Sequence, residues 1–116
     1  MSASVLFIVT GDPRVSPRPA EAIRIAAGVG AWQKAQITVY LRDAAVLALA
    51  EYTDELVDED NFSRYLPIIG EFGRPVYVAR GAAALAELGE TTVRFEEIDD
   101  EQLAALAARS TYVLRF

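Results

Sequence analysis

Three arginines of this chain are placed where they could bind a small anion. Each follows a strongly apolar stretch of strand length: Arg14 after residues 5–10, Arg42 after 37–41 and Arg80 after 75–79. If these stretches are parallel strands, their carboxyl ends lie at one edge of the sheet, where open α/β folds bind ligands. Guanidinium groups bind sulfate, thiosulfate, phosphate or carboxylate through charge-assisted, partly bidentate hydrogen bonds. The expected site residues are Thr10, Gly11, Arg14, Arg42, Arg80 and Gly81.

The sequence alone leaves other uses of these arginines open. Each arginine could instead form a surface ion pair with a nearby carboxylate such as Asp12 or Asp43. In an enzyme, the arginines would hold an anionic substrate and one of these two aspartates would act as the base. A nucleotide-binding regulatory domain is a further alternative, although the first apolar stretch is followed by neither a Gly-x-Gly-x-x-Gly pattern nor a phosphate-loop lysine.

The chain contains no cysteine and no histidine. The commonest pairs of nucleophile and base therefore cannot form, and zinc, haem and iron–sulfur groups lack their usual ligands. The acidic run 54–60 lacks the alternating spacing and the glycine of a calcium-binding loop. We expect no catalytic residue, no metal and no cofactor. Tyr52, Phe62 and Tyr65 flank the acidic run and either belong to the core or form an interface with a basic partner.

Length and composition predict one folded domain, residues 1–116. Of the 116 residues, 53% are hydrophobic, and no low-complexity tract interrupts the sequence. The net charge of −6 disfavours attraction to nucleic acid phosphates or anionic lipid. The apolar run 5–9 is too short to span a bilayer or to act as a signal core, and no basic residue precedes it. These features favour a cytoplasmic protein without nucleic acid or membrane partners.

Strand and helix patterns alternate along the whole chain. Strands are predicted at residues 5–9, 37–41, 75–79, 92–98 and 111–116, and helices at about 17–34, 43–50, 61–72, 82–89 and 100–108. The run 5–9 is apolar throughout, which indicates a central strand buried on both faces, whereas the alternating run 92–98 indicates an edge strand. The most economical arrangement is a three-layer α/β/α fold around a mainly parallel five-stranded sheet.

Local signals mark several helix ends. Ser16 before Pro17 predicts the start of the first helix, Asp43 is expected to cap the second, and Asp99 with Gln102 resembles a capping box. Gly28 and Gly30 lie inside the first helix, where each costs about 1 kcal/mol relative to alanine. We expect the compensation for both glycines to be close packing, with the small side chains of that helix letting it approach the sheet.

A characteristic order of motifs runs along the full length of the chain. The chain opens with Val-Leu-Phe-Ile-Val-Thr-Gly, and an alanine-rich helix, a Val-Tyr-Leu strand and a long middle connection follow. Pro-Val-Tyr-Val then leads into a small-residue helix ending in glycine, and the chain closes with Ser-Thr-Tyr-Val-Leu-Arg-Phe. Together these motifs resemble the DsrE/DsrF-like (DsrEFH) sulfur-relay family. The resemblance implies a compact α/β/α domain that assembles into dimers, trimers or hexamers. Apolar surface left over on so short a domain predicts self-association as well.

In catalytic members of that family, a cysteine just after the third strand carries sulfane sulfur as a persulfide. The matching stretch here is 76–81, and it ends in Ala79, Arg80 and Gly81 without a cysteine. A persulfide requires a thiolate, so this chain alone cannot perform that step. Some family members also lack the cysteine and serve as companion subunits. The resemblance therefore implies a non-catalytic binding or scaffold subunit, for which a cysteine-bearing sulfur-relay protein would be the partner.

Overall fold

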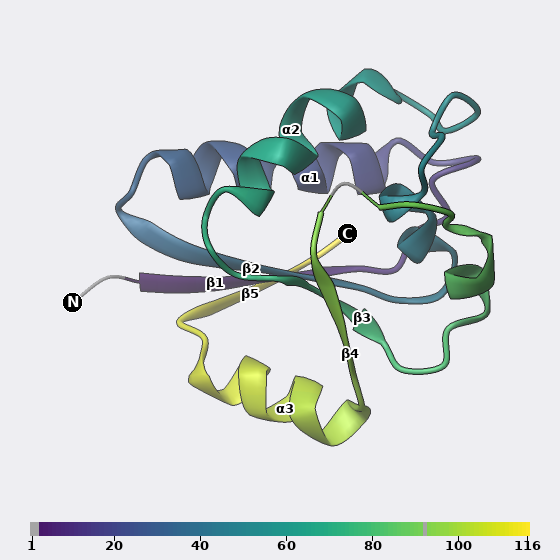
Figure 1. The fold of residues 1–116 in the computed structure, drawn as a ribbon. Coiled ribbons are helices and arrows are strands. Elements are labelled where there is room, and N and C mark those ends of the chain that lie inside the picture. The colour runs from purple at the N-terminus through teal and green to yellow at the C-terminus, as the bar shows by residue number, and fades with distance from the viewer. Residues whose placement is uncertain (1–2, 92) are drawn as a thin grey trace.

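The computed structural model describes residues 3–91 and 93–116, which fold around a sheet of five strands (Figure 1). The strands are β1 (Ala3–Val9), β2 (Ala35–Leu41), β3 (Val76–Ala79), β4 (Phe95–Ile98) and β5 (Tyr112–Arg115). Their order across the sheet is β4-β3-β2-β1-β5, and all neighbouring strands are parallel. The expected α/β fold is confirmed, and the sheet is parallel throughout.

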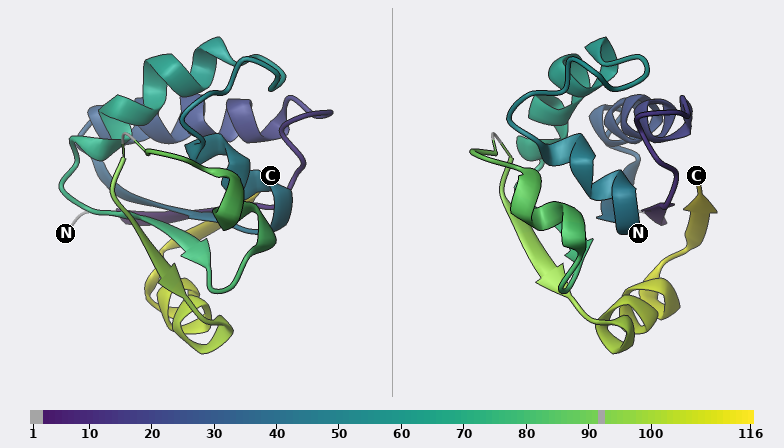
Figure 2. Two further views of the ribbon diagram at one scale, coloured as in Figure 1. Left: turned by 45° about the vertical axis from the view of Figure 1, so that its right-hand side comes forward. Right: turned by 90° about the vertical axis from the view of Figure 1, so that its right-hand side faces the viewer.

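The helices lie on both faces of this sheet (Figure 1; Figure 2). One face carries the α-helices α1 (Arg18–Ala31) and α2 (Asp60–Gly70) and the 3-10 helix η1 (Asp43–Leu49). The other face carries α3 (Asp100–Arg109). A second 3-10 helix, η2 (Ala83–Glu87), follows β3 and packs beside η1, with Ala84 in the large core on the α1 side. The molecule therefore has the three layers that the sequence predicts.

The strand β1 is central because its residues are apolar on both faces. Phe7 and Val9 belong to the large core beneath α1 and α2, whereas Leu6 and Ile8 belong to a smaller core beneath α3. The edge position predicted for the fourth strand is confirmed, since β4 is the outermost strand on its side. It begins at Phe95, later than predicted, and Thr92 lies outside the described residues.

Two of the predicted helices are shorter and tighter than expected. The alanine-rich segment after β3 forms only the 3-10 helix η2, which lies between two residues of positive φ, Gly81 (75°) and Gly89 (68°). The segment before Ala50 is also a 3-10 helix, and the expected cap by Asp43 is wrong: this residue has a φ of 56° and its side chain makes no capping hydrogen bond. The first helix ends at Ala31, before the predicted end.

The predicted start of α1 is correct in part, and that of α3 is confirmed. Pro17 occupies the N-cap position of α1, and Ser16 Oγ accepts a hydrogen bond from the Arg18 N–H at 3.2 Å. At α3, Asp99 Oδ1 accepts from the Gln102 N–H at 2.8 Å, and Gln102 Oε1 accepts from the Asp99 N–H at 2.9 Å. This reciprocal pair is the capping box that the sequence predicts.

Candidate functional site at the carboxyl edge of the sheet

The structure places Thr10, Arg42 and Arg80 directly after the carboxyl ends of β1, β2 and β3, which are neighbours in the sheet. The three predicted arginines, however, are divided between the two faces of this edge. Arg42 and Arg80 line one pocket on the α3 side. Arg14 lines separate hollows beside η1 and η2. The structure thus brings together two of the three predicted cations.

The pocket shared by the two arginines, here called the Arg42–Arg80 pocket, has a volume of about 310 Å³. Its lining consists of Arg42, Ala79, Arg80, Ile98, Asp99 and Asp100. The parallel register explains this grouping, since Leu41 lies opposite Val78 and Ala79 lies opposite Ile98 at the ends of β2, β3 and β4. Because β4 leads directly into α3 (Figure 1), the N-cap residue Asp99 and the first helical residue Asp100 line one side of the pocket. The pocket therefore holds two cations and two carboxylates.

Arg42 is held by two neighbours. Its Nη2 donates a hydrogen bond to Asp100 Oδ1, and its guanidinium carbon lies 5.8 Å from the centre of the Tyr40 ring, within cation–π range. The pKa of Arg42 is raised above its ordinary value, first by the Tyr40 hydroxyl beside the guanidinium and then by the Asp100 carboxylate. Asp100 itself is 82% exposed, so water competes strongly for this ion pair.

Arg80 is held more weakly than Arg42. Its Nη1 lies 3.6 Å from Asp99 Oδ2, and its Nη2 donates a long hydrogen bond of 3.5 Å to Gln102 Oε1. Both partners belong to the capping box of α3, where Asp99 Oδ1 and Gln102 Oε1 already accept backbone N–H groups. The guanidinium of Arg80 is therefore available to a stronger acceptor.

The Tyr40 side chain lies beneath this pocket. Tyr40 is fully buried, in the small core that also contains Ile98 and Ala79 from the pocket lining. Among the described residues, its hydroxyl is the buried side-chain oxygen that has no hydrogen-bond partner. Buried polar atoms are normally paired, so an unpaired hydroxyl beside Arg42 distinguishes this part of the molecule.

Arg14 is neutralised by its own neighbour. Its Nε and Nη2 donate to the two carboxylate oxygens of Asp12 at 3.0 Å each, and its backbone N–H donates to Asp12 Oδ1 at 2.9 Å. These hydrogen bonds lower the pKa of Asp12 and raise that of Arg14. A carboxylate of lowered pKa is a weaker base, which disfavours the enzyme alternative that uses Asp12.

The predicted backbone donors are also occupied. The N–H groups of Thr10 and Gly11 both donate to the carbonyl oxygen of Phe116, at 3.0 and 3.3 Å. The Gly81 N–H donates to Glu97 Oε1 at 3.1 Å. Of the six predicted site residues, Arg42 and Arg80 therefore share a pocket, Arg14 is paired with Asp12, and the N–H groups of Thr10, Gly11 and Gly81 donate to acceptors elsewhere in the chain.

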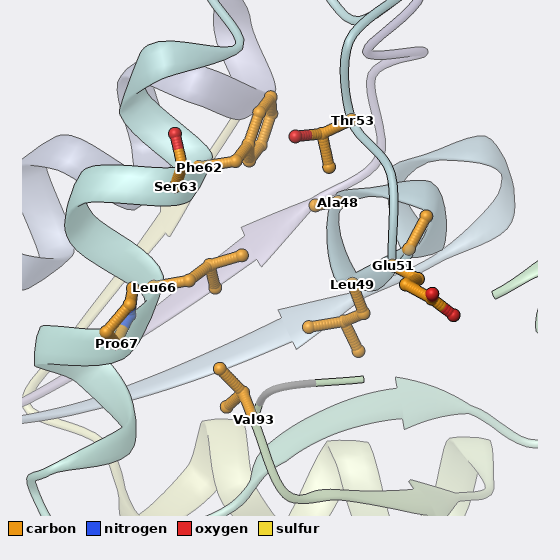
Figure 3. A pocket seen from close by; sticks show the side chains of 10 residues that line it. Ala48, Leu49, Glu51, Thr53, Phe62, Ser63, Leu66, Pro67 and Val93 are labelled. Atoms are coloured by element: carbon orange, nitrogen blue, oxygen red, sulfur yellow. The ribbon is translucent and has the colours of Figure 1, made fainter. Parts of the chain in front are cut away.

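A second hollow, of about 210 Å³, lies between α2 and η1 (Figure 3). Phe62 and Leu66 point into it from α2, opposite Leu49 and Val93. The Glu51 carboxylate at its rim already accepts the Glu90 N–H at 3.0 Å. With a largely apolar lining, this hollow is unsuited to an anion. Sequence reasoning missed it because it depends on packing between segments far apart in the chain.

The acidic run 54–60, whose flanking aromatics were predicted to be core or a partner interface, begins beside a hollow of about 430 Å³ with Arg14 and Glu87 on its rim. Tyr52 is 77% exposed, whereas Phe62 is buried in the core. The pKa of Glu59 is raised, chiefly by a hydrogen bond with the neighbouring Asp60 carboxyl and then by burial and the Asp60 charge. Within the described part of the chain, no group of three or more carboxylates is arranged to hold a metal ion, and no helix is long and apolar enough to cross a membrane.

Comparisons with known proteins show the fold and nothing finer. No protein-family model matches this sequence, and no curated protein matches it either. Among solved structures, the crystal structure of the ychN protein from E. coli matches with a TM-score of 0.80, covering 100% of both chains at 18% sequence identity. This likeness shows that the two chains share the same α/β fold over their full lengths. At such low identity it carries no assignment of a site or an activity.

Proposed function

We propose that this chain is a non-catalytic DsrE/DsrF-like binding subunit of the cytoplasm that holds a small oxyanion between Arg42 and Arg80. The observation that carries the proposal is the pocket of about 310 Å³ that these two arginines share at the carboxyl edge of a parallel sheet. Ligands of open α/β folds bind at this edge. Two guanidinium groups in one pocket match an anion that has several acceptor oxygens.

An oxyanion would compete well with the carboxylates that now contact the arginines. The side chains of Asp99 and Asp100 are 47% and 82% exposed, and exposed ion pairs contribute only about 0–1 kcal/mol. A hydrogen bond between a charged donor and a bound oxyanion contributes about 1.5–3 kcal/mol. An anion contacting both arginines would therefore displace one or both aspartates.

A role in sulfur relay would require a second protein. The chain has no cysteine to carry a persulfide, so sulfur transfer would depend on a cysteine-bearing partner. Isolated protein is expected to take up no labelled sulfane sulfur covalently. Uptake that appears only when a cysteine-bearing partner is present would support the companion role, and covalent labelling of the isolated chain would contradict it.

Self-association is part of the same proposal. Tyr112 and Leu114 are 60% and 41% exposed on β5, the edge strand of the sheet, where a second copy could cover them. Sedimentation velocity at tens of micromolar, on the order of common assay concentrations, is expected to show an oligomer. If β5 forms the interface, the Leu114→Lys variant should self-associate more weakly than the parent protein. A parent protein that is purely monomeric would refute self-association.

The anion site is tested by calorimetric titration with sulfate, thiosulfate and phosphate at constant ionic strength. Arg42→Ala and Arg80→Ala are each expected to weaken binding about 10- to 100-fold, since each removes a charge-assisted contact. Arg94→Ala is the matched control, because Arg94 is exposed and its Nη2 makes only a long contact of 3.5 Å to the Gly73 carbonyl. Absence of binding at millimolar anion, or equal affinities in all variants, would overturn the proposal.

A further inference from the structure

The Tyr40 hydroxyl has an unmet need for a hydrogen-bond acceptor. Tyr40 is 0% exposed, and its oxygen has no hydrogen-bond partner among the described residues. A buried hydroxyl without a partner loses its hydrogen bonds with water and gains none in exchange, which destabilises the free protein. Such a group is explained most simply by a partner that is present only when a ligand is bound.

The position of the hydroxyl connects it to the Arg42–Arg80 pocket. Tyr40 and Arg42 are two residues apart near the end of β2, so both side chains project from the α3 face of the sheet. The Arg42 guanidinium lies against the Tyr40 ring, and Ile98 and Ala79 belong both to the Tyr40 core and to the pocket lining. Arg42 therefore separates the buried hydroxyl from the open pocket.

The two side chains have complementary hydrogen-bonding capacity. A guanidinium carries only donors, whereas a tyrosine hydroxyl is both a donor and an acceptor. Arg42 can donate to the Tyr40 oxygen, but it cannot accept the Tyr40 proton. At present the guanidinium is turned towards Asp100, an exposed residue at the start of α3. An anion that draws Arg42 away from Asp100 would bring an acceptor oxygen to the hydroxyl.

We infer that Tyr40 belongs to the oxyanion site: its ring orients Arg42, and its hydroxyl donates a hydrogen bond to a third oxygen of a tetrahedral anion. This inference rests on the proposed anion-binding function. A carboxylate has two oxygens in one plane, and Arg42 and Arg80 would use both. A tetrahedral anion such as sulfate keeps further oxygens outside that plane. Tyr40 would therefore favour tetrahedral oxyanions over carboxylates.

The test compares the binding of sulfate and acetate to the parent protein, Tyr40→Phe and Tyr65→Phe. Tyr65 is a half-buried tyrosine on α2, packed against the opposite core, so its hydroxyl provides the control for the same chemical change. We expect Tyr40→Phe to bind sulfate about 10-fold more weakly, or about 1.4 kcal/mol, with acetate affinity unchanged. Tyr65→Phe should bind both anions like the parent.

A urea unfolding curve separates this role from a purely structural one. Because the Tyr40 hydroxyl has no acceptor for its proton among the described residues, Tyr40→Phe should be about as stable as the parent. Unchanged sulfate affinity in Tyr40→Phe would overturn the inference and leave the anion site in place. Equal loss of sulfate and acetate binding together with lower stability would also overturn it. A parent protein that binds neither anion would instead refute the proposed function itself.

Discussion

Two glycines of α1 provide a sharp test of how this fold is packed. Both lie in the helix, and close packing was expected to compensate for each of them. At Gly30 an added Cβ would lie 2.3 Å from Cε2 and 2.6 Å from Cζ of Phe72. At Gly28 an added Cβ would meet no atom within 4 Å, and this residue is exposed. Close packing is therefore present at Gly30, although against Phe72 after α2 and not against the sheet, and the expectation is wrong at Gly28.

The two substitutions to alanine should therefore change stability in opposite directions. Gly28→Ala removes the entropic cost of glycine in a helix and should stabilise the protein by about 0.5–1 kcal/mol. Gly30→Ala gains less, because it lies one residue from the helix end. It also forces the Phe72 ring back by about 1 Å, and overpacking of this kind typically costs about 1–3 kcal/mol. The expected net loss is about 1–2 kcal/mol.

Urea unfolding followed by far-ultraviolet circular dichroism measures both changes. For a chain of this size, 1 kcal/mol corresponds to roughly 4 °C in Tm, so thermal unfolding should separate the two variants clearly. Adding Phe72→Leu to Gly30→Ala should recover part of the loss, because the smaller side chain relieves the clash. The packing argument is refuted if Gly30→Ala is as stable as Gly28→Ala, or if removing the Phe72 ring has the same effect in both backgrounds.

Three further predictions concern charged side chains of the carboxyl edge. Asp99→Ala should lower the unfolding free energy by about 1 kcal/mol in urea titration, because the α3 cap is lost. Asp99→Asn should keep most of the capping stabilisation, because asparagine is also a good N-cap residue. The Asp12 carboxyl should titrate below the ordinary aspartate pKa by NMR, and Arg14→Gln should raise that pKa. Because the folded-state pKa is lowered, the stabilisation is present at neutral pH and is lost as the pH falls through the folded pKa. An Asp12 pKa in Arg14→Gln that equals that of the parent would contradict this. Asp100→Asn should bind sulfate up to about 5-fold more tightly in calorimetry, since it removes a competitor for Arg42 whose ion pair contributes about 0–1 kcal/mol, and weaker binding would oppose this reasoning.

Much of the fold could be predicted because its signals are local. The uninterrupted apolar run of β1 requires burial on both faces, and the capping box of Asp99 and Gln102 lies within four residues. The segment after β3 could not be predicted from its alanines. Gly81 and Gly89 adopt positive φ and leave too few residues between them to nucleate a stable α-helix, so the segment closes with i to i+3 hydrogen bonds such as Leu85 N–H to the Ala82 carbonyl.

The sequence by itself determined that arginines follow strands β1 to β3 and that a parallel sheet would bring these strand ends to one edge. Only the tertiary structure decided which of them share a pocket. Arg42 and Arg80 share a pocket on the α3 face, where residues at the start of α3 contact both of them. These contacts join distant parts of the chain: Asp100 lies 58 residues beyond Arg42, and Gln102 lies 22 residues beyond Arg80. Arg14 instead turns back to Asp12 beside it. The side on which a helix packs, and the carboxylates that it brings, depend on contacts between distant residues, which the pattern around each arginine does not contain.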